Sequence, residues 1–168
     1  MGVDGAYSGG AGDVVADVGA LLLGRSLASL GADAGFVATL TADGGAIEVS
    51  RVTPWSAAPV HLRFPSDAPY PIAESLRSRR QIVIADNDEL ACDHPGLVRV
   101  KPEDHACASL PLVGRDGEIV GAINVGFEEP RAITEAELAA IEAVARHVTS
   151  AMTAACELQR ELERLADR

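Results

Sequence analysis

The first segment of the chain carries apolar residues every three or four positions between residues 14 and 30. This spacing places them on one face of a helix. Asp13 is a suitable N-cap and Gly31 a suitable end for that helix. Gly19 and Gly24 lower its intrinsic stability, so we expect it to depend on packing against a partner surface. The apolar stripe consists of Val14, Val18, Leu21, Leu22, Leu27 and Leu30.

Short apolar runs then indicate strands. Residues 36–41 and 47–52 have the length of two strands, and the Ala-Asp-Gly-Gly sequence between them suits a hairpin turn. Residues 61–64 are a shorter third candidate. Five prolines lie between residues 53 and 71, which is too many for a central strand or a helix interior. We therefore expect a structured loop there, of the kind that carries recognition.

The middle of the chain predicts one more helix and one more strand. Pro71 suits the first turn of a helix that runs to about Arg80, and residues 81–85 are apolar enough for a buried strand. Residues 86–104 are mostly irregular in pattern, with one helical turn expected after Asn87.

Two strands and a long helix are predicted to close the chain. Residues 108–113 and 118–127 have strand length, and Arg-Asp-Gly between them suits a hairpin because glycine accepts the positive φ of such turns. Thr134 has Glu137 three residues further on, which is the pattern of a capping box at a helix start.

Composition narrows the class of protein. Hydrophobic residues make up 48% and charged residues 23% of the 168 residues, which is typical of a folded chain. This length suits one domain with appended helices. A formal net charge of −11 argues against nucleic-acid binding, because nucleic-acid phosphates would be repelled.

The cysteines and the chain start bear on the compartment. Cys92, Cys107 and Cys156 are odd in number and widely spaced, so we expect no disulfide framework and a reducing compartment, by default the cytoplasm. No apolar run reaches transmembrane length, and residues 1–12 are typical of a flexible leader rather than a signal peptide. We expect no membrane contact by this chain.

The closing segment resembles a known family. Its two strands, tight turn and long helix, with Pro111 in the first strand and Gly121 in the second, are similar to the closing half of GAF domains. These are the small-molecule-sensing modules of bacterial signalling proteins. The stretch PYPIAESLRSRRQIVIADNDEL strengthens the likeness, because GAF modules of actinobacterial sensor proteins commonly show a Pro-led helix, a basic end and a strand followed by Asp there. The resemblance covers residues 14–155.

The resemblance implies a fold and a domain organisation. We expect an α+β, GAF/PAS-like fold with an antiparallel sheet of five or six strands. Its first and last helices would cover one face, and a loop-roofed pocket would lie on the other. The chain would then consist of a leader (1–12), a GAF domain (13–155) and a C-terminal helical extension for signalling (156–168).

Alternation along residues 119–127 predicts which sheet face holds the pocket, because successive side chains of a strand point to opposite faces. The bulky face is expected to pack on the helices and consists of Ile119, Ile123, Val125 and Phe127. The other face leaves room for a ligand and consists of Val120, Ala122, Asn124 and Gly126.

Asn124 is the leading candidate for ligand contact, because its amide offers a donor and an acceptor in an otherwise apolar wall. The alternative is that this amide only hydrogen-bonds a loop carbonyl. The same alternation would place Ala108 and Leu110 on the pocket side. The ligand is also expected to touch a roof that consists of Tyr70, Asp86, His94 and His105.

The cofactors of known relatives are not supported by the residues. Haem-binding relatives place their proximal histidine where this chain has Lys101. The Cys-His pair of bilin-binding relatives is absent, and the cyclic-nucleotide motif falls on Phe127-Glu128 and Glu137-Leu138. A nucleotide is left open by this comparison but is not indicated, so the cofactor stays unknown.

Metal binding is not supported either. Histidine and cysteine ligands that zinc accepts occur at Cys92, His94, His105 and Cys107, but their spacing matches no closed site. The acidic residues of segment 86–93 lack the spacing and central glycine of a calcium loop, so we expect helix-capping and solvated side chains there.

An enzymatic alternative comes from the free methionine sulfoxide reductases, one branch of the family, which use cysteines in the roof loop and near the following strand. Cys92 and Cys107 fall in roughly these regions, and the chemistry would be thiolate attack followed by disulfide resolution. The other residues of that branch are not reproduced, and Cys107 lies in an apolar run that suits a small buried side chain. We therefore do not expect an enzyme.

The last helix carries a heptad repeat that predicts a coiled coil. Its a positions are Ile141, Val148, Ala155 and Leu162, and its d positions are Val144, Ala151, Leu158 and Leu165. The alternative is that the first part packs on the sheet and only the charged segment beyond Ala155 is free. That segment needs a partner helix to be stable.

These patterns favour a sensory GAF domain. It would bind a small molecule and, as a homodimer through its first and last helices, pass its state to an output partner or domain such as a phosphatase, a kinase or a transcription regulator. The alternative is a structural dimerisation module whose pocket is filled by its own side chains.

Overall fold

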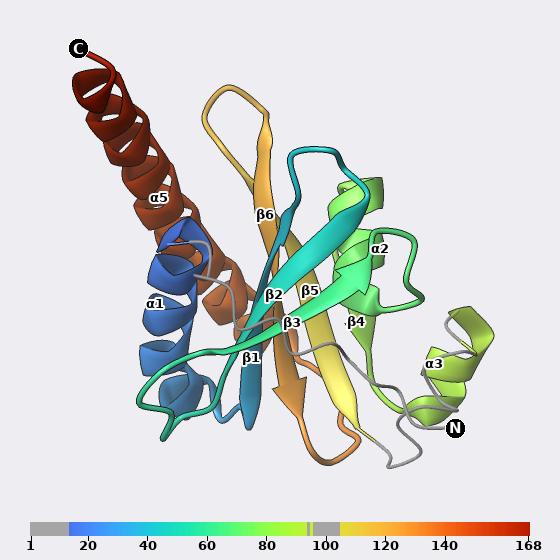
Figure 1. Ribbon diagram of the computed structural model, residues 1–168. Coiled ribbons are helices and arrows are strands. Elements are labelled where there is room, and N and C mark those ends of the chain that lie inside the picture. The colour runs from blue at the N-terminus through green and yellow to red at the C-terminus, as the bar shows by residue number, and fades with distance from the viewer. Residues whose placement is uncertain (1–13, 94, 96–104) are drawn as a thin grey trace.

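A six-stranded antiparallel sheet forms the centre of the molecule (Figure 1). The computed structural model describes residues 14–93, 95 and 105–168, so the expected leader lies outside the described residues. The strands lie in the order β3-β2-β1-β6-β5-β4, which places both strands of the closing hairpin inside the sheet. Their bounds are β1 (Ala34–Leu40), β2 (Ala46–Val52), β3 (Val60–Pro65), β4 (Ile82–Ile84), β5 (Ala106–Val113) and β6 (Ile119–Phe127).

Helices lie on both faces of this sheet. The first and last helices, α1 and α5, pack together on one face, and α2 lies on the opposite face (Figure 1). This arrangement confirms the layers that the family resemblance implied. The described helices are α1 (Val14–Leu30), α2 (Pro71–Ser78), α3 (Asn87–Asp93) and α5 (Glu135–Ala166).

The helix ends follow the local sequence. Gly31, with a φ of 65°, takes the left-handed conformation that ends α1. Pro71 occupies the first turn of α2, where its missing N–H costs no hydrogen bond. Thr134 and Glu137 form the predicted capping box: the Glu137 N–H donates to Thr134 Oγ1 at 3.2 Å, and the Thr134 N–H donates to Glu137 Oε2 at 2.9 Å.

The main core lies between the sheet and the α1–α5 layer. Ile123 and Val125 of β6 are fully buried there together with Val148 and Met152 of α5, as the alternation predicted. Gly19 allows the two helices to approach closely, because a Cβ at this position would lie 2.7 Å from the Sδ of Met152. The glycine that weakens α1 in isolation therefore contributes to its packing in the folded protein.

A β-bulge at the start of β6 reverses the faces on which Ile119 and Val120 were expected to lie. Leu112 pairs with Gly121, but Val113 pairs with Ile119, so Val120 is an extra residue in the ladder. One extra residue reverses the order of faces. As a result Val120 packs against the core under the helices and Ile119 packs on the opposite face, so the predictions for these two residues were wrong.

The edge strand β3 is connected to α1 through a shared carboxylate. Asp17 Oδ1 lies 2.7 Å from Nε2 of His61 on β3 and accepts a hydrogen bond of 3.1 Å from the Ser50 hydroxyl on β2. The short strand candidate at residues 61–64 is confirmed as part of β3, which is paired only with β2 at the edge of the sheet, a position that prolines tolerate. The residues between β2 and β3 and between β3 and α2 form the expected loops.

Candidate ligand-binding site

A pocket of about 400 Å³ opens on the sheet face opposite α1 and α5. Its lining residues come from β1, β2, β3, β5 and β6, from the loop that precedes β3 and from the start of α2. Segments that are distant in sequence therefore meet around one cavity, as small-molecule sites commonly require.

Asn124 of β6 faces this pocket, as the alternation predicted. Its side chain is 8% exposed, and its Nδ2 donates a hydrogen bond of 2.7 Å to the hydroxyl oxygen of Ser109 on β5. Ser109 is fully buried and lies directly opposite Asn124 in the ladder. The described partner of this amide is thus a neighbouring strand's side chain rather than a loop carbonyl.

Ala108 and Leu110 do not lie on the pocket side, and this expectation was wrong. Directly paired residues of two antiparallel strands share a face. Ala108 pairs with Val125 and Leu110 pairs with Ile123, so both belong to the core under α1 and α5. Their neighbour Cys107 lines the pocket instead.

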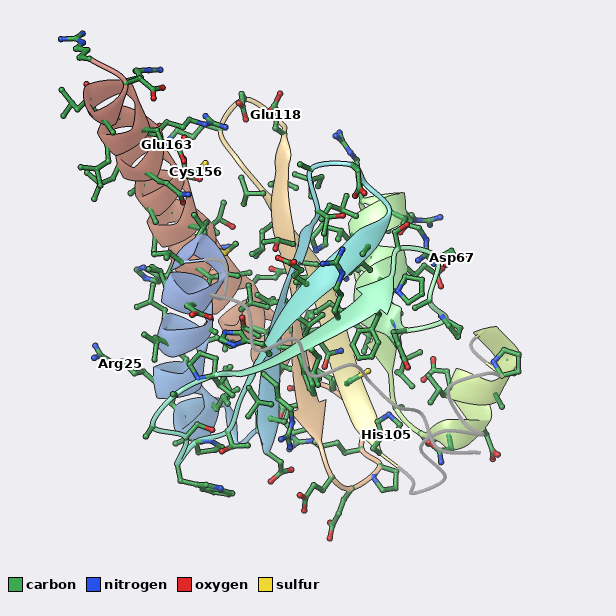
Figure 2. All side chains as sticks on the ribbon, in the orientation of Figure 1. Arg25, Asp67, His105, Glu118, Cys156 and Glu163 are labelled. Atoms are coloured by element: carbon green, nitrogen blue, oxygen red, sulfur yellow. The ribbon has the colours of Figure 1, made fainter. Side chains whose placement is uncertain are left out.

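The expected roof residues divide into three groups. Tyr70 and His105 line the pocket, and the buried His105 directly precedes β5. Figure 2 shows His105 at this end of the strand. Asp86 is not among the described lining residues. Its Oδ1 accepts a hydrogen bond of 2.9 Å from the Glu89 N–H, so it caps the start of α3. His94 lies outside the described residues.

Aromatic residues form much of the wall, and of these only Tyr70 was predicted from the sequence to contact a ligand. The rings of Phe64 and Tyr70 pack with their centroids 4.7 Å apart and an interplanar angle of 59°. The one signal for them in the sequence is their rarity, since aromatic residues make up only 4% of the chain. All those within the described part of the chain line this pocket, and they are Phe36, Trp55, Phe64, Tyr70 and Phe127.

Charges of both signs surround the opening. Arg51 of β2 lies with its guanidinium carbon 6.0 Å from the centre of the Phe36 ring. Asp33 and Glu128 also line the pocket, and the Asp33 Oδ2 accepts a hydrogen bond of 2.8 Å from the Glu128 N–H. The lining thus carries one guanidinium and two carboxylates.

The cysteines lie apart in the fold. Cys92 is exposed on α3, Cys107 is buried on β5 and Cys156 is half-buried on α5, and these three cysteines form no disulfide. Within residues 14–93, 95 and 105–168, no three His, Cys, Asp or Glu side chains are grouped as metal ligands.

A second hollow of about 600 Å³ lies where α5 passes the end of α2 and the start of β6. Cys156 and Glu163 of α5 border it (Figure 2), and so does Arg77, whose guanidinium already donates to the carbonyl of Ser66. It lies beside the exposed end of α5, so we regard the aromatic-lined pocket as the candidate site.

The antiparallel sheet, with two helices on one face and a pocket on the other, defines an α+β module of the GAF/PAS-like type. A family model described as "GAF domain" matches residues 15–153. The chain therefore belongs to the GAF family, whose members are sensory and regulatory domains of signalling proteins. No curated protein matches the chain significantly.

Solved structures show the same fold at low sequence identity. The GAF domain of the Acinetobacter phosphoenolpyruvate-protein phosphotransferase is 7% identical, with a TM-score of 0.64 over 84% of this chain and 83% of that chain. The second GAF domain of DevS from Mycobacterium smegmatis is 17% identical, with a TM-score of 0.60 over 86% and 96%. Residues 122 to 287 of a methyl-accepting chemotaxis protein are 17% identical, with a TM-score of 0.62 over 82% and 89%.

None of the helices in the described part of the chain combines the length and the apolarity needed to span a bilayer.

Proposed function

We propose that this GAF domain binds a small molecule in the aromatic-lined pocket and transmits its occupancy through α5 to an output partner or domain. The observation that carries this proposal is the double role of β6. Asn124 faces the pocket, while Ile123 and Val125 on either side of it pack in the core under α1 and α5. A ligand that moves β6 therefore changes the packing of the last helix.

The exposed end of α5 supports an output role for this helix. Every residue from Glu157 to Arg168 is exposed, and the helix extends beyond the part that packs on α1 (Figure 1). Leu158, Leu162 and Leu165 are 62%, 58% and 55% exposed at heptad spacing. An isolated helix of this kind is marginal in water, so it favours a partner helix. A parallel homodimer through α1 and α5 supplies one.

Transmission requires that the ligand bind two arrangements of α5 unequally, since a ligand shifts an equilibrium only by its differential affinity. The output is a phosphatase, a kinase or a transcription regulator, and the place of action is the cytoplasm. Similar solved structures come from a phosphoenolpyruvate-protein phosphotransferase and a methyl-accepting chemotaxis protein, which supports a signalling context. The domain itself acts without catalysis.

The alternative is a structural dimerisation module whose pocket is filled by its own side chains. The open volume of about 400 Å³ favours ligand binding over this alternative.

Native mass spectrometry of protein purified from the organism that encodes it tests the proposal. The wild type should carry an additional small-molecule mass, and Asn124→Leu should carry less of it. Val113→Ala is the matched control, because Val113 is 48% exposed and lies outside the pocket lining. Removal of the small molecule by unfolding and refolding should change amide hydrogen exchange along α5.

Two results would favour the dimerisation module instead. One is that neither the wild type nor the control carries any additional mass. The other is that hydrogen exchange along α5 is the same before and after the bound molecule is removed.

A further inference from the structure

The chain places its few aromatic side chains around one cavity. Aromatic residues make up 4% of the sequence, and all those in the described part of the chain line the candidate pocket. They come from β1, β3, β6, the loop before β3 and the residue before α2, so tertiary structure rather than local sequence brings them together. These residues are Phe36, Trp55, Phe64, Tyr70 and Phe127.

Most of these rings still have surface that a ligand could cover. Phe36, Phe64 and Tyr70 are half-buried, and the Trp55 side chain is 80% exposed at the pocket. A set of aromatic residues that served only as core would be fully buried against other side chains. Phe127 differs, because it is buried in the core under α1 and α5 as well as lining the pocket, and that core is otherwise aliphatic.

The polar groups of the pocket are few and their charges oppose one another. Asn124 and His105 are 8% and 6% exposed and lie among the aromatic walls. Arg51, Asp33 and Glu128 line the same pocket. An anionic ligand would be repelled by the two carboxylates and a cationic ligand by the guanidinium, whereas an uncharged ligand is repelled by neither.

We infer that the pocket takes an uncharged, planar aromatic or heteroaromatic molecule of about two fused rings, with a polar substituent that hydrogen-bonds to the Asn124 amide. This inference rests on the proposed function, since it names the ligand class of the same site. The size follows from the volume, because about 400 Å³ is near the lower end of small-molecule pockets. Planarity follows from the aromatic faces, which favour offset stacking and edge-to-face contacts.

A matched pair of probes tests the inference. 2-Naphthol and decahydro-2-naphthol share a carbon skeleton and a hydroxyl group, but only the first is aromatic and planar. Isothermal titration calorimetry on the full chain should show 2-naphthol binding about tenfold more tightly than decahydro-2-naphthol. Trp55 is the single tryptophan of the chain and lines the pocket, so quenching of its emission by 2-naphthol reports binding at this site.

Two variants and one charged probe sharpen the test. Trp55→Leu should weaken 2-naphthol binding about threefold and leave decahydro-2-naphthol unchanged, because it replaces a stacking surface by an aliphatic one. Trp55 is 80% exposed, so this change should not affect folding. Val113→Ala, outside the pocket lining, should change neither affinity. 2-Naphthoate should bind more weakly than 2-naphthol, because the carboxylates of Asp33 and Glu128 outnumber the Arg51 guanidinium in the pocket lining.

Equal or tighter binding of decahydro-2-naphthol would overturn the inference, and so would the absence of 2-naphthol binding. Amide hydrogen exchange along α5 separates this outcome from a failure of the proposed function. If the saturated compound binds and changes exchange in α5, the ligand class is wrong and the sensory function stands. If 2-naphthol binds with the expected preference but α5 exchange is unchanged, the ligand class stands and the transmission fails.

Discussion

The hydrogen bond between Asn124 and Ser109 should stabilise the fold in addition to shaping the pocket. The Nδ2 of Asn124 lies 2.7 Å from the Oγ of Ser109, and Ser109 is fully buried. Asn124→Leu keeps a side chain of similar size but removes the donor. A hydrogen bond contributes about 0.5–1.5 kcal/mol, and a buried polar group left unpaired costs about 1–3 kcal/mol.

Asn124→Leu should therefore lower the free energy of unfolding by about 1–2 kcal/mol, with the pocket-facing leucine recovering part of the loss. Ser109→Ala alone should lower it by about 1 kcal/mol. The double variant should lose less than the sum of the two, because the second substitution removes a group that the first left unpaired. The coupling energy should be about 1 kcal/mol.

Urea denaturation followed by far-ultraviolet circular dichroism measures these differences. The protein should first be unfolded and refolded to remove any bound molecule, since a ligand adds apparent stability. All variants should be compared at one protein concentration and with an unchanged denaturant slope. Ser29→Ala is the control, because its exposed hydroxyl donates only within α1, to the Ser26 carbonyl at 2.8 Å, and should cost less than about 0.5 kcal/mol.

A coupling energy of zero, together with an unchanged stability of Asn124→Leu, would refute this reasoning. The Asn124 amide would then contribute nothing to the apo fold and would be reserved for a ligand.

Three further predictions concern the helix end, the glycines and a turn. The double variant Leu158→Glu with Leu162→Glu should be a monomer in light scattering and keep the circular dichroism of the wild type, because it would bury charges between the two α5 helices of the proposed dimer. A dimer that persists would place the interface elsewhere. Gly121→Ala should lower the free energy of unfolding by about 1–3 kcal/mol in urea denaturation, since the new Cβ would lie 2.6 Å from the Ala38 carbonyl oxygen. Gly24→Ala should instead raise it by up to about 1 kcal/mol, because its Cβ would lie 3.5 Å from the Cβ of Val52 and alanine favours the helix. The opposite order of stabilities would contradict this reasoning. The Thr41 hydroxyl and the Gly45 N–H donate to the Asp43 carboxylate and hold its pKa below the ordinary value of 3.8. The ionised Asp43 therefore stabilises the folded state above pH 3.8, and this contribution is lost as the pH falls through the lowered pKa. The stability difference between wild type and Asp43→Asn should accordingly shrink in urea titrations below about pH 4, and a difference that grows there would refute the assignment.

Local features of this fold were predictable from the sequence. The end of α1 at Gly31, the start of α2 at Pro71 and the capping box of Thr134 each depend on residues within one turn of one another. Period-two alternation likewise places Asn124 and Val125 on opposite faces of β6, because the geometry of a single strand requires it.

Features that depend on two strands were not predictable in the same way. Ala108 and Leu110 were assigned to the wrong face because the pairing register with β6 decides which residues lie opposite. The bulge at Val120 reversed the alternation in the same ladder. Gly121 beside it is a weak signal, because a glycine in a strand indicates either a bulge or a close backbone approach, and only the pairing of the two strands shows the bulge.

The pocket shows the same division between local and tertiary information. The family resemblance and the alternation of β6 determined the sheet, the helical layer and the face on which Asn124 lies. Only the tertiary structure brought Trp55, Phe64 and Tyr70 to that face, because they lie in the proline-rich segment and beside α2. Local sequence sets backbone conformation, but pairing and packing between distant segments decide which side chains share a cavity.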